Sequence, residues 1–153
     1  MNTKTNQKRK KSAVNEIKFE FPSLSVNESM ARSAVAAFCS QLDPSAVEIA
    51  DVKCAVSEAV TNSIVHGYRD KLGVIYIRVK LFENNEVRVE IKDKGCGIEN
   101  VSRAMEPLYT TDAENERSGM GFTVMESFCD RVRVRSRLGK GTTVILTKVF
   151  EGK

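Results

Sequence analysis

The sequence lacks the features that mark metal-binding, secreted or membrane-spanning chains. Its four cysteines are scattered without a C-x-x-C pair, and His66 is its single histidine, so no zinc site is expected. No signal peptide and no apolar run long enough to span a bilayer occur. We therefore expect a cytoplasmic protein with reduced thiols and no membrane partner.

The positive charge of the chain is concentrated at its beginning. The 153 residues carry a net charge of +4, and five basic residues (Lys4, Lys8, Arg9, Lys10 and Lys11) lie in the first dozen. Without them the remainder carries 4 − 5 = −1. Residues 1–12 are predicted to be a flexible basic tail and 13–153 a single domain, with no direct nucleic-acid contact.

Periodicity predicts an α+β fold. Helical spacing of apolar residues begins at Asn27, capped by Asn27 or Ser25, and a second helix of about 22 residues runs from the Asp43-Pro44 cap to Gly67. A third helix is predicted to open at Gly119. Strands are predicted at 14–22, 74–82, 87–93, 131–136 and 142–149. Grouped helices between hairpins favour a two-layer α/β sandwich, with a mixed, mostly antiparallel sheet covered by helices on one face.

The long second helix carries a polar face. Glu58, Asn62 and His66 are spaced four residues apart, which places them on the same side of the helix. Taken alone, this pattern is equally typical of a solvated stripe.

Two glycine motifs follow in the chain. Asp93-Lys-Gly95-Cys-Gly97 leaves a predicted strand end, where a carboxylate stands beside residues that let a ligand approach the backbone. Ser118-Gly119-Met120-Gly121-Phe122 lies at a predicted helix start, which offers a cap and free N–H groups to phosphate. Individually, either motif could be an ordinary turn or helix start.

The order of these motifs resembles the GHKL ATPase and kinase superfamily. The segments E-A-V-T-N-S-I-V-H-G-Y, D-K-G-C-G-I, P-L-Y-T-T, E-R-S-G-M-G-F-T-V-M-E and G-T-T are more closely similar to the sporulation anti-sigma F factors, a family of bacterial serine kinases. The resemblance covers nearly everything after the basic tail. It implies the Bergerat-type α/β sandwich, which binds Mg-ATP between a long helix, glycine loops and a lid.

The resemblance also implies roles for particular residues. Asn62 matches the Mg²⁺ ligand and Glu58 the general base, while Asp93 matches the acceptor of the adenine amino group. Arg117 resembles the arginine near the terminal phosphates, Thr142 a residue near adenine, and Arg32 a partner-binding arginine. The remaining expected nucleotide contacts come from the two glycine motifs, at Gly95, Gly97, Ser118, Gly119, Met120 and Gly121.

The implied function is that of a dimeric anti-sigma factor and kinase. A sigma F-like factor would be held in the ATP-bound state, with the lid at 98–118 ordered, and a serine of an anti-anti-sigma partner would be phosphorylated. Alternatives are a general-stress anti-sigma kinase, a nucleotide-gated binding module with little turnover, and a histidine kinase fragment. We expect His66 and Cys96 to be structural or incidental, and Met105, Leu108, Thr110 and Thr111 to serve local packing or turns.

Overall fold

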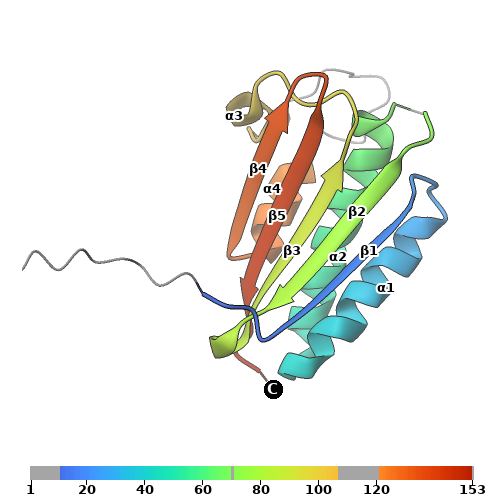
Figure 1. Ribbon diagram of the computed structural model, residues 1–153. Coiled ribbons are helices and arrows are strands. Elements are labelled where there is room, and N and C mark those ends of the chain that lie inside the picture. The colour runs from blue at the N-terminus through green and yellow to red at the C-terminus, as the bar shows by residue number, and fades with distance from the viewer. Residues whose placement is uncertain (1–10, 70, 107–120, 153) are drawn as a thin grey trace, which may run out of the picture.

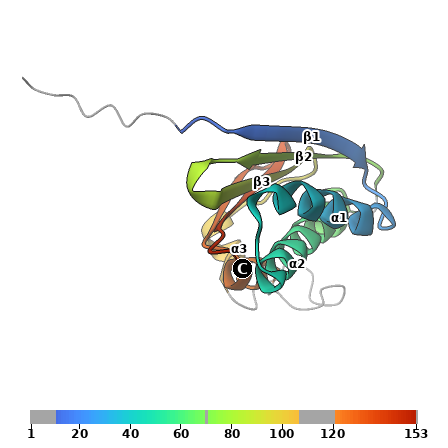
Figure 2. The same cartoon turned by 90° about the horizontal axis from the view of Figure 1, so that it is seen from below.

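A five-stranded sheet is covered on one face by helices (Figures 1 and 2). The computed structural model describes residues 11–69, 71–106 and 121–152. The elements, in chain order, are β1 Asn15–Pro22, α1 Asn27–Cys39, α2 Ala46–Asn62, β2 Val74–Leu81, β3 Glu86–Asp93, α3 Val101–Ala104, α4 Gly121–Phe128, β4 Arg131–Arg137 and β5 Gly141–Val149. The predicted α+β sandwich is confirmed.

The strand order is β1-β2-β3-β5-β4. All four pairings are antiparallel, so the sheet has none of the parallel pairing that a mixed sheet would contain. Buried and less buried residues alternate along β2 and β3, so one side of each strand faces the helices and the other faces outward. The outer side is left open.

The core lies between the sheet and the helices. Branched aliphatic residues of β2 and β3, such as Ile75, Val79 and Ile91, are fully buried against α1 and α2. On α1 the buried stripe is Ala31, Val35 and Cys39, so Cys39 packs as the expected small apolar residue. Burial raises the pKa of its thiol to about 12.

Both predicted helix caps are wrong. Val26 stands at the N-cap of α1, where no side chain caps the helix; Asn27 instead donates to the carbonyl of Pro22. At α2 the cap is Ser45, which exchanges hydrogen bonds with Glu48 in a capping box. Asp43 lies just before, in a left-handed conformation with φ 53°, which turns the chain.

The predicted length of the second helix is confirmed, but its last turn differs from an α-helix. The α-helical part covers 17 residues, and Ser63–Gly67 continue it as a π-helical turn of five, here called the π-turn. The extra residue in this wider turn changes which side chains face inward. The predicted start of the third helix at Gly119 lies outside the described residues, and the described helix begins at Gly121.

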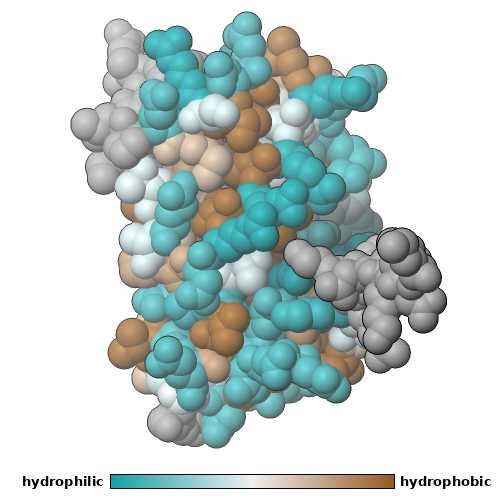
Figure 3. All heavy atoms as spheres, turned by 90° about the vertical axis from the view of Figure 1, so that its left-hand side faces the viewer, coloured by the Kyte–Doolittle hydropathy of each residue, from teal (hydrophilic) through white to brown (hydrophobic). Residues whose placement is uncertain are grey.

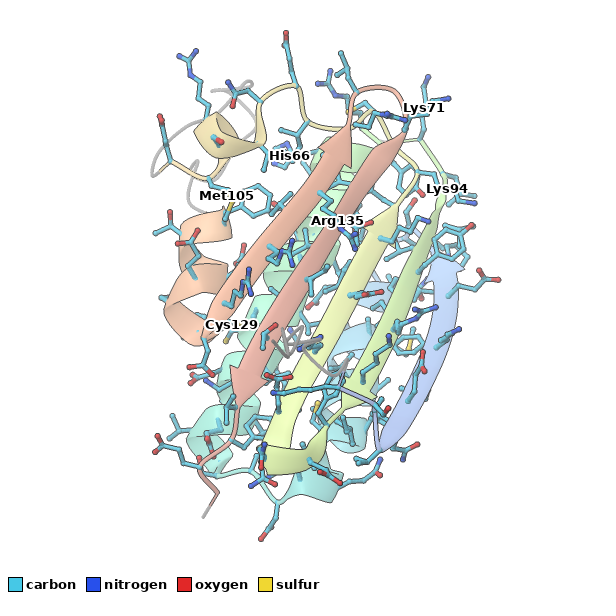
Figure 4. The ribbon with its side chains drawn as sticks, turned by 60° about the vertical axis from the view of Figure 1, so that its left-hand side comes forward. His66, Lys71, Lys94, Met105, Cys129 and Arg135 are labelled. Carbon is cyan, nitrogen blue, oxygen red and sulfur yellow. The ribbon has the colours of Figure 1, made fainter. Side chains whose placement is uncertain are left out.

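The open face of the sheet is locally basic although the folded part as a whole is not. Arg131, Arg133, Arg135 and Arg137 alternate along the edge strand β4 and are exposed, and they form no ion pair within the described ranges. Figure 4 shows Arg135 on this face. On the side seen in Figure 3, apolar residues are interspersed among polar ones. The four arginines of β4 therefore form a local basic surface, although the net charge of residues 13–153 is close to zero.

The observed cap of α2 can be tested by mutation. Ser45→Ala removes the hydroxyl that accepts from the Glu48 N–H, and should lower the free energy of unfolding by about 1 kcal/mol. Ser33→Ala, at an exposed position of α1, is the matched control and should leave stability unchanged. Urea denaturation measures both. Equal stability of the two variants would contradict the assignment of the cap.

Candidate nucleotide-binding site

A cavity of about 620 Å³ opens at one end of the molecule. Its wall is formed by the end of α2 and the π-turn, the loop after β3, α3, the start of α4 and the start of β5. Figure 4 shows His66 and Met105 near this end, behind the sheet. Of the predicted residues, the structure brings Asn62, Asp93, Gly97, Gly121 and Thr142 together on this wall.

Asp93 is a buried charged residue on the wall of this cavity. It ends β3 and is only 3% exposed, and one carboxylate oxygen accepts a hydrogen bond from the Gly95 N–H at 3.0 Å. Burial raises the pKa of Asp93 above its ordinary value of 3.8, while hydrogen bonds from the Gly95 backbone, the Ser63 hydroxyl and the Thr142 backbone lower it in part. A buried hydrogen-bond acceptor thus lies on the cavity wall.

Ser63 is a site residue that the sequence did not reveal. The described residues bury four polar or charged side chains, and three of these, Ser63, Asp93 and Thr142, lie on the wall of this cavity. Since buried polar groups are costly unless they are hydrogen-bonded, their gathering here indicates a binding site. Ser63 continues the buried face of α2, four residues after Ala59, and its side chain hydrogen-bonds to Asp93.

Close backbone packing holds the carboxylate in place. A Cβ added to Gly67 would lie 2.9 Å from the Asp93 carboxyl carbon, and one on Gly95 would lie 2.1 Å from the Gly67 carbonyl oxygen. Gly141 is equally constrained, because its Cβ would approach the Asp93 carbonyl oxygen to 2.1 Å. Glycine is required at these points because three chain segments meet without room for side chains.

Hydrogen bonds tie the loop after β3 to its neighbours. The Cys96 N–H donates to the Gly67 carbonyl, and the Gly139 N–H donates to the Cys96 carbonyl at 2.7 Å. The Cys96 thiol lies on the cavity wall and contacts the His66 carbonyl oxygen at 3.2 Å. Gly97 has φ +75°, which favours glycine. The loop between the π-turn and the β4–β5 turn is therefore fixed from both sides.

Asn62 and Glu58 occupy different positions relative to the cavity. Asn62 lines it, and its side-chain amide lies against Gly121, where an added Cβ would be 3.0 Å from the Asn62 nitrogen. Glu58 lies one helical turn earlier, half-buried, and is not part of the cavity wall. The amide oxygen suits Mg²⁺, which usually takes few protein ligands and completes its shell with phosphates and water.

No cluster of three His, Cys, Asp or Glu side chains that could hold a metal occurs within residues 11–69, 71–106 and 121–152.

Several predicted residues lie outside the described residues. They are Arg117, Ser118, Gly119 and Met120 of the second glycine motif, and Leu108, Thr110 and Thr111 of the expected lid.

The cavity includes two cationic residues that the sequence did not single out. Arg69 follows the π-turn in a left-handed conformation with φ 47°, and Arg103 lies on the short helix α3, whose N-cap is Asn100. Both line the cavity. Their place on the cavity wall could not be predicted because each belongs to a segment without a motif.

Comparison with known proteins places the chain in a family. Residues 21–148 match the Histidine kinase-like ATPase domain family. Anti-sigma F factors are similar over most of the chain: that of Clostridium acetobutylicum is 55% identical over 136 residues, covering 89% of this chain and 94% of the relative, and that of Geobacillus sp. is 54% identical, covering 88% and 92%. This chain belongs to the anti-sigma F factor family.

Solved structures of other proteins share the fold of this anti-sigma F family member. The RsbU and RsbW domains of Rv1364c from Mycobacterium tuberculosis superpose with a TM-score of 0.65 at 20% identity, covering 89% of this chain and 32% of that one. A blue-light activated histidine kinase domain from Erythrobacter litoralis EL346 gives 0.53 at 19%, covering 85% and 62%. No helix in the described ranges is long and apolar enough to cross a membrane.

The burial of Asp93 predicts a pH dependence of stability. Because folding raises its pKa, the folded state favours the protonated carboxyl, and this contribution is lost as pH rises from 3.8 through the raised value. Relative to Asp93→Asn, the free energy of unfolding of the wild type should therefore fall with rising pH and then level off. Urea denaturation between pH 4 and 8 measures the difference. A relative stability that rises with pH would contradict the assignment.

The backbone packing can be tested with two glycines. Gly95→Ala forces a Cβ against the Gly67 carbonyl and should cost roughly 3 kcal/mol of unfolding free energy. Gly139→Ala meets no atom within 4 Å and should cost only about 1 kcal/mol, for its positive φ. Chemical denaturation compares them. An equal cost would show that the close approach of the two segments is not what requires Gly95.

Proposed function

We propose that this protein is an anti-sigma factor and protein serine kinase. In the ATP-bound state it captures a sigma F-type factor of RNA polymerase, and with Mg-ATP it phosphorylates a serine of an anti-anti-sigma partner. The observation that carries the proposal is the buried Asp93 acceptor on the wall of a cavity of about 620 Å³, in a chain whose relatives are anti-sigma F factors.

Adenine recognition is assigned to Asp93 and its neighbours. The carboxylate accepts a hydrogen bond from the exocyclic amino group of adenine, and a guanine, which presents a carbonyl there, would leave the buried acceptor unpaired. The close packing of Gly67, Gly95 and Gly141 supports this role because it leaves the carboxylate little freedom to turn toward another donor. Thr142 is buried beside Asp93, and we assign it to contact the edge of the adenine base.

The phosphates are assigned to the opposite part of the cavity. Asn62 would hold Mg²⁺, which neutralises phosphate charge in the bound nucleotide. The second glycine motif, from Ser118 to Gly121, would donate N–H groups at the start of α4, and Arg117 would approach the terminal phosphate. What supports this placement is the contact of Asn62 with Gly121, the described end of that motif.

Glu58 is assigned as the general base. The serine oxygen of the partner forms a bond to the γ-phosphorus while the bond to the leaving ADP oxygen breaks, and the Glu58 carboxylate accepts the serine proton. Glu58 lies one turn from Asn62 on α2, so the base and the metal ligand share one rigid element. Its position beside the cavity suits a group that meets the protein substrate rather than the nucleotide.

We assign Arg32 on α1 to the surface that binds the protein partners. We also propose that the protein acts as a homodimer. We further propose that ATP orders the lid at 98–118 and that this ordered form holds the sigma factor. His66 lies on the cavity wall beside Asn62, which is a position for contacting the nucleotide or supporting the wall; a histidine kinase would instead need a separate phosphoacceptor domain.

The kinase assignment predicts a selective loss in Glu58→Gln. Transfer of labelled γ-phosphate to the anti-anti-sigma factor of the same bacterium should fall about 10²- to 10⁴-fold, because the base is removed. ATP affinity should stay at the wild-type value since Glu58 does not line the cavity. Glu83→Gln, in the exposed turn between β2 and β3, is the matched control.

The outcomes separate the proposal from its alternatives. Wild-type protein that binds the sigma factor but transfers no phosphate would be a nucleotide-gated binding module. An acid-labile product would indicate phosphohistidine. Capture of a general-stress sigma factor in place of sigma F would assign the chain to the other regulatory system, with the same site chemistry.

A further inference from the structure

The candidate partner residue Arg32 is held by a second helix. Its Nη1 lies 3.3 Å from one Glu28 carboxylate oxygen and 3.4 Å from the other, one turn earlier on α1. Glu28 also accepts a hydrogen bond from the Ser57 hydroxyl of α2. The three side chains therefore form a chain of contacts from α2, through Glu28, to the guanidinium.

The contact with Ser57 distinguishes this pair from an ordinary surface ion pair. Exposed pairs spaced four residues apart on a helix contribute little, since two flexible side chains must be ordered. Here the Glu28 side chain is 19% exposed and is fixed by a hydroxyl that donates to its charged oxygen. The position of the guanidinium is consequently set relative to α2 as well as to its own helix.

Part of the guanidinium stays available to a ligand. Arg32 is 39% exposed in its side chain, and its hydrogen bonds and ion pair with Glu28 use Nη1. A guanidinium has five N–H donors in a planar fork, so its other edge can bind a second carboxylate with two hydrogen bonds. The partner group that fits is an Asp or Glu side chain.

Ser57 lies directly before the candidate base Glu58. Ser57 and Asn62 are five residues apart on α2, which turns their side chains about 140° from one another, so Ser57 faces α1 while Asn62 faces the cavity. A movement of α2 at the nucleotide site would displace Ser57 and, through Glu28, the guanidinium.

We infer that Glu28, held by Ser57, is a positioning residue that orients Arg32 toward a carboxylate of the protein partner and links that surface to the nucleotide-binding helix. The inference rests on the proposed function for the identity of the partner, a sigma factor. Its structural part, the fixed contact between the two helices, stands independently.

The test compares Ser57→Ala, Ser57→Thr and Glu28→Gln with the wild type. Ser57→Ala and Glu28→Gln should each weaken binding of purified sigma F from the same bacterium about tenfold in ATP, because Arg32 is no longer held in place. Ser57→Thr keeps the hydroxyl and should restore binding. ATP affinity, measured by calorimetry, should be unchanged in all three, and Ser33→Ala on the exposed side of α1 is the control.

Unchanged sigma binding in Ser57→Ala, or a parallel loss of ATP affinity, would overturn the inference. Failure of the wild type to bind sigma F would instead reject the proposed function. The contact between Ser57 and Glu28 is then tested by a double-mutant cycle, which compares the unfolding free energies of Ser57→Ala, Glu28→Gln and the double variant. A measurable coupling supports the contact and additive effects refute it.

Discussion

The site depends on one constraint, the burial of the Asp93 carboxylate where three chain segments meet. The π-turn at the end of α2 contacts it through Ser63 and Gly67, and Gly141 of β5 packs on its backbone. Burying a carboxylate is unfavourable without such hydrogen bonds; burial raises the pKa of Asp93, and the hydrogen bonds from Gly95, Ser63 and Thr142 act in the opposite direction. The arrangement keeps a strong acceptor ready for a ligand that brings its own donor.

The antiparallel fold brings these three chain segments together around Asp93. Pairing of β3 with β5 brings Asp93 opposite Thr142, although 48 residues lie between them in the sequence. The helices lie on the same face of the sheet, so the end of α2 reaches the end of β3 (Figure 2). A single long helix can then carry the candidate cation ligand Asn62, the candidate base Glu58 and the contact from Ser57 to α1.

The sequence predicted the features that follow from local patterns. Alternation gave the five strands, apolar spacing gave α1 and α2, and a carboxylate followed by glycines at a strand end pointed to Asp93. The cap of α2 was misplaced at Asp43-Pro44, although Ser45-Ala-Val-Glu48 has the S-x-x-E spacing of a capping box. Ser63 was missed because a lone serine four residues after Ala59 on a buried helix face carries no signal of its own until its hydrogen-bond partner Asp93 is known. The contact between Ser57 and Glu28 depends on how two helices pack, which periodicity does not determine.

The central claim is that a buried carboxylate selects adenine through its amino group. The most direct measurement is the affinity of the wild-type protein for Mg-ATP, compared by calorimetry with the purine ribonucleoside triphosphate that lacks only the 6-amino group. Loss of the donor leaves Asp93 unpaired, so the analogue should bind at least about tenfold more weakly. Equal affinities for the two nucleotides would contradict the account.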